Sequence, residues 1–303
     1  MFSRQRYSST KRRAFGTFPF LLLTLIGILA GCGGSTSLTA TVQPAPANQP
    51  AIPIIPVTAV DYGYEMPSTL DVTAGLVDIA MVDNGAQPHQ TQVARLKPGV
   101  TRDQVLDELV TKRNQAAAFS LLTFVGGPDI VSPGYGQETI LNLPAGQYVL
   151  LCFVVGQDGI PHVYKGMIHF FTVAPVQRPQ VPPPQADGEV IMKDLGYELP
   201  SVITQSRVLT LQVVNQGSEA HEMNLVKLNK GAGVQDIISF FQSPSGPPPF
   251  EEVGGMAALV AGGSGWIKIH LEPGTYAALS LLPEQRTGKF QLLLGMITTF
   301  TVR

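Results

Sequence analysis

The chain has 303 residues, of which 44% are apolar and 14% charged, and it contains 31 glycines and 25 prolines. This length allows two domains of ordinary size, and the glycine and proline content favours many short strands joined by turns. Residues 1–31 carry five Lys or Arg and no acid, which leaves 15 basic and 22 acidic residues in the rest of the chain. That acidic balance argues against nucleic acid as a partner and against electrostatic adsorption to anionic lipid.

The N-terminal segment, residues 1–31, is predicted to be an export signal. A basic stretch precedes an apolar run from Phe18 to Ala30, which is too short for a membrane span of about 20 residues. The run ends in Leu-Ala-Gly-Cys32, which resembles a lipobox, so Cys32 is predicted to carry a lipid that anchors the chain to a membrane on the extracytoplasmic side. An ordinary signal peptide with a chance cysteine is the alternative. The basic stretch also faintly resembles a twin-arginine signal, but a plain basic region is the preferred interpretation.

Two stretches rich in proline divide the remaining chain. Residues 32–56 are predicted to be the lipidated Cys and a disordered tether, and residues 175–186 a stiff Pro-rich linker. The blocks between and after them, 57–174 and 187–303, are predicted to be two domains of nearly equal length.

The two blocks repeat each other in sequence. Several landmarks recur in one order over the full block length, which indicates a duplicated domain and not a short solenoid repeat. They include Asp61-Tyr62-Gly63-Tyr64-Glu65-Met66-Pro67 with Asp194-Leu195-Gly196-Tyr197-Glu198-Leu199-Pro200, Gly85 with Gly217, and Gly126-Gly127 with Gly254-Gly255.

Each block consists mainly of short strand candidates. The stretches 77–82, 147–153, 167–173 and 208–214 are rich in residues that favour strands. One helix is expected in each block; Thr101 and Gln104 form a capping-box pattern before the first, and Ile237, Ile238 and Phe241 make an apolar stripe in the second. The predicted fold is all-β, with two tandem Greek-key β-sandwiches that each carry one short inserted helix.

Four residues of the first block have the chemistry of a metal site: His89, Cys152, His162 and Met167. If Cys32 is lipidated, Cys152 has no disulfide partner, and an unpaired cysteine in an exported protein needs another role, as a metal ligand or as an inert buried thiol. Two imidazoles and a thiolate with a weak axial thioether form the ligand set of a blue-copper electron-transfer centre.

The order of these residues resembles the cupredoxin family of plastocyanin, azurin and the copper domains of nitrite reductases. The shared marks are Gly85-x-x-Pro-His89, a Cys closing the penultimate strand, a His in the next loop and a Met shortly after it. The resemblance implies two cupredoxin-like domains and one type 1 copper held by His89, Cys152, His162 and Met167. The nine residues between Cys152 and His162 make a longer loop than in plastocyanin, closer to that of the nitrite reductase copper domain.

The second block is predicted to be a degenerate copy. His221 and Met296 align with the first His and the Met, whereas Ser280 and Gln291 stand where the Cys and the second His would be. A hydroxyl and an amide are poor copper ligands, so no type 1 copper is expected in this block.

The resulting prediction is a lipid-anchored extracytoplasmic copper protein that transfers single electrons to or from an unknown redox protein partner. The alternatives are a non-redox interaction module and a copper-handling lipoprotein. The chain is not expected to be an enzyme. It has only five histidines and lacks the His-x-His pairs of laccase-type oxidases, and Leu151 stands where copper nitrite reductases place a ligand of their second copper.

Overall fold

The computed structural model describes residues 51–68, 70–175 and 181–303. The predicted signal, Cys32 and most of the tether lie outside the described residues. Within the described part no helix is long and apolar enough to cross a membrane. The end of the predicted tether is structured, because the first strand begins at Ile54.

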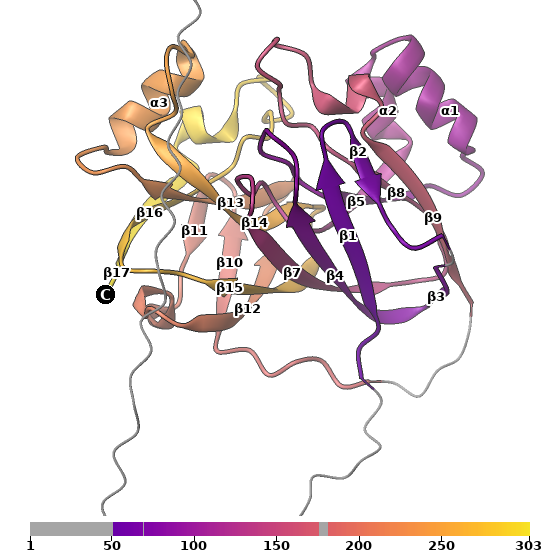
Figure 1. Cartoon of the computed structure of the whole chain (residues 1–303), viewed down its shortest axis with the longest axis horizontal. Helices are drawn as coiled ribbons and strands as arrows, with labels where there is room; N and C mark the ends of the chain where they lie inside the picture. Colours follow the sequence, from indigo (N-terminus) through magenta and orange to yellow (C-terminus); the bar gives the residue numbers. More distant parts are fainter. Residues whose placement is uncertain (1–50, 69, 176–180) are drawn as a thin grey trace, which may run out of the picture. The chain divides into compact units, whose positions relative to one another are not determined.

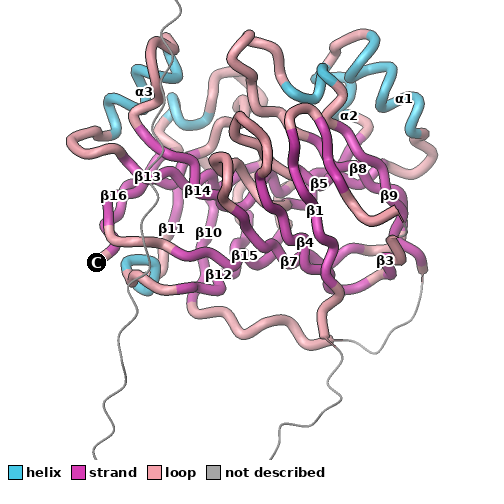
Figure 2. Tube along the Cα trace, viewed as in Figure 1, coloured by secondary structure: helices cyan, strands magenta, loops and turns pink. Residues whose placement is uncertain are grey.

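Strands account for most of the regular secondary structure in the described chain (Figures 1 and 2). The first block contains β1 (Ile54–Val60), β2 (Gly63–Glu65), β3 (Val72–Thr73), β4 (Gly75–Asp83), β5 (Gln92–Leu96), β6 (Leu122–Gly126), β7 (Gly136–Leu143), β8 (Gly146–Leu151) and β9 (Ile168–Ala174). The second contains β10 (Gly188–Lys193), β11 (Gly196–Glu198), β12 (Val208–Asn215), β13 (His221–Leu228), β14 (Phe250–Leu259), β15 (Ser264–His270), β16 (Gly274–Leu279) and β17 (Ile297–Val302). The predicted all-β fold is confirmed.

The helices are short and interrupt the strand sequence. In the first block α1 (Arg102–Leu106) runs into a π-helical turn at Asp107–Thr111, and α2 (Gln115–Ser120) follows. The predicted capping box is present, since Thr101 and Gln104 each accept a hydrogen bond from the other's backbone N–H. The second block has one α-helix, α3 (Val234–Gln242). The extra helix α2 was not predicted; it begins at Asn114, whose side chain caps it.

Two mixed sheets run through both blocks of the described chain. One has the order β11-β10-β12-β15-β7-β4-β1-β2, and the other β17-β16-β13-β14-β6-β5-β8-β9-β3. Strands β4 and β7, and likewise β5 and β8, are neighbours in a sheet without being consecutive in sequence, so connections cross between the sheets as in a Greek key. The blocks join where β7 pairs with β15 and β6 pairs with β14.

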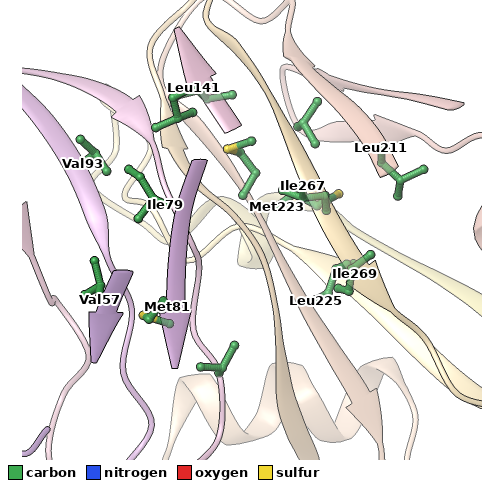
Figure 3. Close-up of a cluster of buried hydrophobic side chains, with 14 of the residues drawn as sticks. Val57, Ile79, Met81, Val93, Leu141, Leu211, Met223, Leu225, Ile267 and Ile269 are labelled. Atoms are coloured by element: carbon green, nitrogen blue, oxygen red, sulfur yellow. The ribbon is translucent and has the colours of Figure 1, made fainter. Parts of the chain in front are cut away.

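The buried core continues across this junction. Figure 3 shows Ile79 and Leu141 of the first block in one cluster with Leu211, Met223 and Ile267 of the second. The described residues belong to one compact unit. The division into two domains at 175–186 therefore stays a prediction about the duplicated sequence, and the shared sheets make the two halves structurally interdependent.

Candidate metal centre

Three of the four predicted ligands lie on the loop between β8 and β9. Cys152 directly follows β8, and the loop folds back so that the backbone N–H of Cys152 bonds to the carbonyl of Met167 at 3.4 Å. A 3₁₀ turn begins at His162 and ends at Gly166, whose positive φ of 100° suits glycine. The backbone N–H of Met167 closes this turn by bonding to the carbonyl of His162 at 3.1 Å. The loop thus holds Cys152, His162 and Met167 together, and all three are fully buried.

His89 comes from a different part of the chain, the connection between β4 and β5. Two backbone hydrogen bonds with Val131, of 3.2 and 3.0 Å, fix its position. Its ring centroid is 4.9 Å from that of His162, and its Nδ1 lies 2.9 Å from Oδ1 of Asp83. A Cβ added at Gly85 would stand 2.3 Å from Cε1 of His89, so glycine is required there for the ring to fit.

The side chains of Cys152 and His162 are in contact. Nδ1 of His162 is 3.5 Å from Sγ of Cys152. Burial, followed by the nearby charge of His89, lowers the pKa of His162 to about 4, so its imidazole is neutral at neutral pH. Burial raises the pKa of Cys152 to about 12, so without a cation the thiol keeps its proton.

The residues present fit a small, soft metal ion. Bonds of about 2.3 Å to a thiolate and about 2.0 Å to an imidazole, at a tetrahedral angle, separate sulfur and nitrogen by about 3.5 Å. Nε2 of His89 and Nε2 of His162 are buried without a hydrogen-bond partner. Across the described ranges no three His, Cys, Asp or Glu side chains form a closed metal-binding group.

The second block repeats the backbone of this loop. The N–H of Ser280 bonds to the carbonyl of Met296 at 3.3 Å, and the N–H of Met296 bonds to the carbonyl of Gln291 at 3.0 Å, matching the bonds of Cys152 and Met167. A 3₁₀ turn again begins at the equivalent position, Gln291, and ends at a glycine with positive φ, Gly295. The backbone of this loop is therefore the same in both halves, and the two sites differ in their side chains.

The side chains of the second site satisfy one another. Oε1 of Gln291 lies 2.8 Å from Nδ1 of His221 and accepts a 2.8 Å hydrogen bond from Oγ of Ser280. Nε2 of Gln291 donates to the carbonyl of Ala220, and Nε2 of His221 lies 3.0 Å from Oδ1 of Asp194. Each of these polar side-chain groups has a partner, and none of them is the thiolate that copper prefers.

The two histidines also differ in orientation. His221 directs Nδ1 toward Gln291, and its Nε2 faces Asp194. In the first block Asp61 takes the place of Asp194, and its Oδ1 is 3.7 Å from Nε2 of His89. A half-turn of the His89 ring would give it the orientation of His221, with Nδ1 released from Asp83. The terminal torsion of histidine is broad and roughly two-fold, so this is a small adjustment.

Several residues at the site were not predicted as functional from the sequence. They are Asp61, Tyr62, Asp83 and Lys165, of which Tyr62 packs edge to face on His162 and Lys165 lies over the Tyr62 ring. A signal for one of them was present, because Tyr62 against Leu195 is one of only two differences within a seven-residue landmark, the other being Met66 against Leu199. The contact with His162 depends on segments 100 residues apart, which a repeat alone does not reveal.

Comparison with known proteins gives weak likenesses. No protein-family model matches the chain, and no curated protein matches its sequence. Among solved structures, dithionite-reduced auracyanin from Roseiflexus castenholzii is 20% identical, covering 42% of this chain and 100% of that chain at a TM-score of 0.29. Auracyanin A from Chloroflexus aurantiacus, titled a blue copper protein, is 21% identical over 39% of this chain and 98% of that chain at 0.26. A multicopper oxidase is 16% identical over 82% and 88% at 0.24. At such TM-scores we infer function from the chain's own residues.

Proposed function

We propose that this chain binds one copper ion in its first half, through His89, Cys152, His162 and Met167, and that it transfers single electrons. When bound, the copper supplies the exchange between Cu(I) and Cu(II). A trigonal set of two imidazoles and a thiolate with a weak axial thioether suits this exchange. The protein is an electron carrier and not an enzyme, and its redox protein partner is not identified.

The main support for this proposal is the difference between the candidate site of the first half and the equivalent position in the second half. They share the same backbone hydrogen bonds, but in the second Oε1 of Gln291 contacts both Nδ1 of His221 and Oγ of Ser280, whereas in the first Nδ1 of His162 faces the thiol of Cys152 at 3.5 Å. A thiol and an imidazole at this separation can both bind one metal ion, and a hydroxyl and an amide are poor copper ligands. This difference between the two halves supports one copper per chain.

The chain's own residues prepare the site in two ways. The 3₁₀ turn orients the imidazole of His162 so that Nδ1 faces the thiol of Cys152. His89 moves to the orientation seen in His221, and Asp61 then supports its outer nitrogen as Asp194 supports that of His221. We further propose that a lipid on Cys32 anchors the chain on the extracytoplasmic side of a membrane, as its N-terminal sequence indicates.

Visible and EPR spectra of the full chain, purified in detergent and titrated with Cu(II), test this proposal. We expect one copper per chain and an intense thiolate-to-copper absorption that disappears in Cys152→Ser. His221→Gln is the matched control in the second half and should leave the spectrum unchanged. A folded protein that takes up no copper would contradict the proposal, and so would a bound copper that cannot be reduced and reoxidised.

A further inference from the structure

The outer side of His162 is covered by one aromatic side chain. The ring of Tyr62 meets the imidazole of His162 edge to face, with centroids 5.3 Å apart and planes at 77°. His162 is fully buried while Tyr62 is 37% exposed, so Tyr62 lies between the imidazole and solvent. The buried Nε2 of His162 has no hydrogen-bond partner.

Two direct contacts hold the Tyr62 ring in place, and each is supported by one further contact. Nε2 of Gln87 donates to the Tyr62 hydroxyl at 3.0 Å, and Oε1 of Gln87 accepts from the backbone N–H of Gln157 at 3.1 Å. Nζ of Lys165 lies 4.3 Å from the centroid of the Tyr62 ring and is itself paired with Asp158 at 2.7 Å. The negative face of an aromatic ring attracts such a cation. The long loop between Cys152 and His162 thus supplies Gln157 and Asp158, which fix the cover.

The backbone at this position is in an unfavourable conformation. Tyr62 has a φ of 68°, and its counterpart Leu195 has a φ of 61°. A bulky residue with positive φ is strained and persists only where the surroundings impose that conformation. Because both halves keep this turn, the strain does not depend on the side chain, and exchanging the two side chains isolates the role of the ring.

The second half has no imidazole at the position equivalent to His162, so it shows which side chain then occupies the position equivalent to Tyr62. There Leu195 replaces the tyrosine, and Gln291 replaces His162. Leu294 stands in the place of Lys165, so the cation over the ring is also missing. The aromatic ring, its cation and the imidazole therefore occur together in the first half and are replaced together in the second.

We propose that Tyr62 is a cover that keeps water and external reagents away from His162, and that it is a positioning residue for the metal centre. Excluding water disfavours the more highly charged Cu(II) state, so the cover raises the reduction potential of the bound copper. The effect on the potential rests on the proposed function, whereas the exclusion of water from His162 does not.

The first test uses the full chain without metal. Diethyl pyrocarbonate modifies accessible, neutral imidazoles, and peptide mass spectrometry would give the rate at each histidine. His270 is exposed and serves as the internal reference. We expect His162 to react at least tenfold more slowly than His270 in the natural chain, and Tyr62→Leu to raise the His162 rate at least fivefold.

Two variants separate the ring from other effects. Tyr62→Phe should keep the protection, because the ring and not the hydroxyl covers Nε2. Leu195→Tyr places a tyrosine on the matching turn of the second half and should leave the His162 rate unchanged. Circular dichroism confirms that each variant is folded. A natural chain in which His162 reacts as fast as His270, or a Tyr62→Leu variant with no change in rate, would overturn the cover.

The second test uses the copper-loaded chain. A redox titration should show a lower potential in Tyr62→Leu than in the natural chain, with Tyr62→Phe restoring most of the difference. An unchanged potential would refute the link between the cover and the metal while leaving the modification result intact. A chain that takes up no copper would instead refute the proposed function. The modification test would still show whether Tyr62 shields His162.

Discussion

At the scale of single residues, the two halves differ at two of the four candidate ligand positions. The loop of the second half has the same backbone hydrogen bonds as that of the first. His221 already directs Nδ1 toward Gln291, and Met296 is fully buried. What is missing is a thiol at Ser280 and an imidazole at Gln291. The second half therefore provides a direct test of whether the ligand set alone decides metal binding.

We predict that Ser280→Cys combined with Gln291→His gives the chain a second copper site. The expected result is a stoichiometry of two copper ions per chain and about twice the thiolate-to-copper absorption. Ser280→Cys alone should not produce the band, because it provides the thiolate but leaves an amide in place of the second imidazole. A stoichiometry that stays at one in the folded double variant would show that features beyond these two residues define the first site.

Gly85 gives a second prediction at this scale. An alanine Cβ would stand 2.3 Å from Cε1 of His89 and 2.8 Å from Oδ1 of Asp61, so the ring must move. We expect Gly85→Ala to weaken copper binding at least tenfold in an equilibrium titration. Gly217→Ala is a matched control, since its Cβ would stand 2.3 Å from Nε2 of His221. Equal losses of copper affinity in both variants would contradict a local effect on His89.

At the scale of elements, paired glycines shape the strands that meet at the junction. Gly127 and Gly255 have φ values of 133° and 136°, and each faces a carbonyl oxygen across the sheet. A Cβ would lie 2.0 Å from the carbonyl of Thr91 in the first half and 1.8 Å from that of Met223 in the second. The pairing of β5 with β6 and that of β13 with β14 shift register close to these glycines, so the glycines accompany β-bulges.

We therefore expect Gly127→Ala and Gly255→Ala each to lower the free energy of unfolding by about 3 kcal/mol or more, from the clash with backbone and the strain of the positive φ. Gly134→Ala is the control, because Gly134 has a positive φ of 86° but nothing within 4 Å of a Cβ. It should cost only about 1 kcal/mol. Urea unfolding of the three variants measures this difference, and similar losses at all three positions would contradict the role of the close approach.

The strand pattern was predictable because it is local. The apolar stretches at 77–82 and 208–214 became β4 and β12, and the Thr101–Gln104 capping box starts α1 as predicted. Helix α2 was missed because its sequence, Gln115–Ser120, has no apolar stripe that a short window would reveal. Local patterns determine single elements, and they do not determine which elements pair.

The sequence predicted candidate ligands for the site, but it did not predict their surroundings. Spacing and residue type pointed to Cys152 and His162, which the structure places 3.5 Å apart. The contact of His89 with Asp83 and the packing of Tyr62 on His162 arise from loops that meet only in the folded chain. No short sequence window contains both partners of the Tyr62–His162 contact.

At the scale of the whole molecule, the halves are joined through pairings that the sequence did not predict. Strand β7 pairs with β15, and Lys268 of β15 bridges Asp78 and Glu138 of the first half. The amide of Gln137 forms two hydrogen bonds with the backbone of Gly255: Nε2 donates to the carbonyl, and Oε1 accepts from the N–H. Such contacts involve partners more than 100 residues apart, and a repeat in sequence shows only that the halves are alike.

The junction also buries acidic side chains. Asp129, on the segment that bridges to β14, is fully buried, and its Oδ2 has no hydrogen-bond partner. Glu222 and Glu252 of the second half are close enough for their charges to affect each other and Asp129. Burial raises the pKa of Asp129 to about 7 and that of Glu252 to about 8. The folded protein therefore holds these groups protonated well above the pH at which they ionise in an unfolded chain.

The sign of the resulting pH dependence follows from proton binding. Between about pH 4 and pH 8 the folded state binds more protons at these groups than the unfolded state, so the free energy of unfolding falls as pH rises. The stabilisation is fully present below about pH 4 and is lost as the pH passes through the raised pKa values.

We predict that Asp129→Asn, which cannot ionise, stabilises the protein at pH 8 by on the order of 2–4 kcal/mol and has little effect near pH 4.5. Urea unfolding at both pH values measures this change, with the exposed Glu189→Gln as the control. An equal effect of Asp129→Asn at the two pH values would mean that the substitution acts through packing, and that the carboxyl at the junction is charged in the folded state.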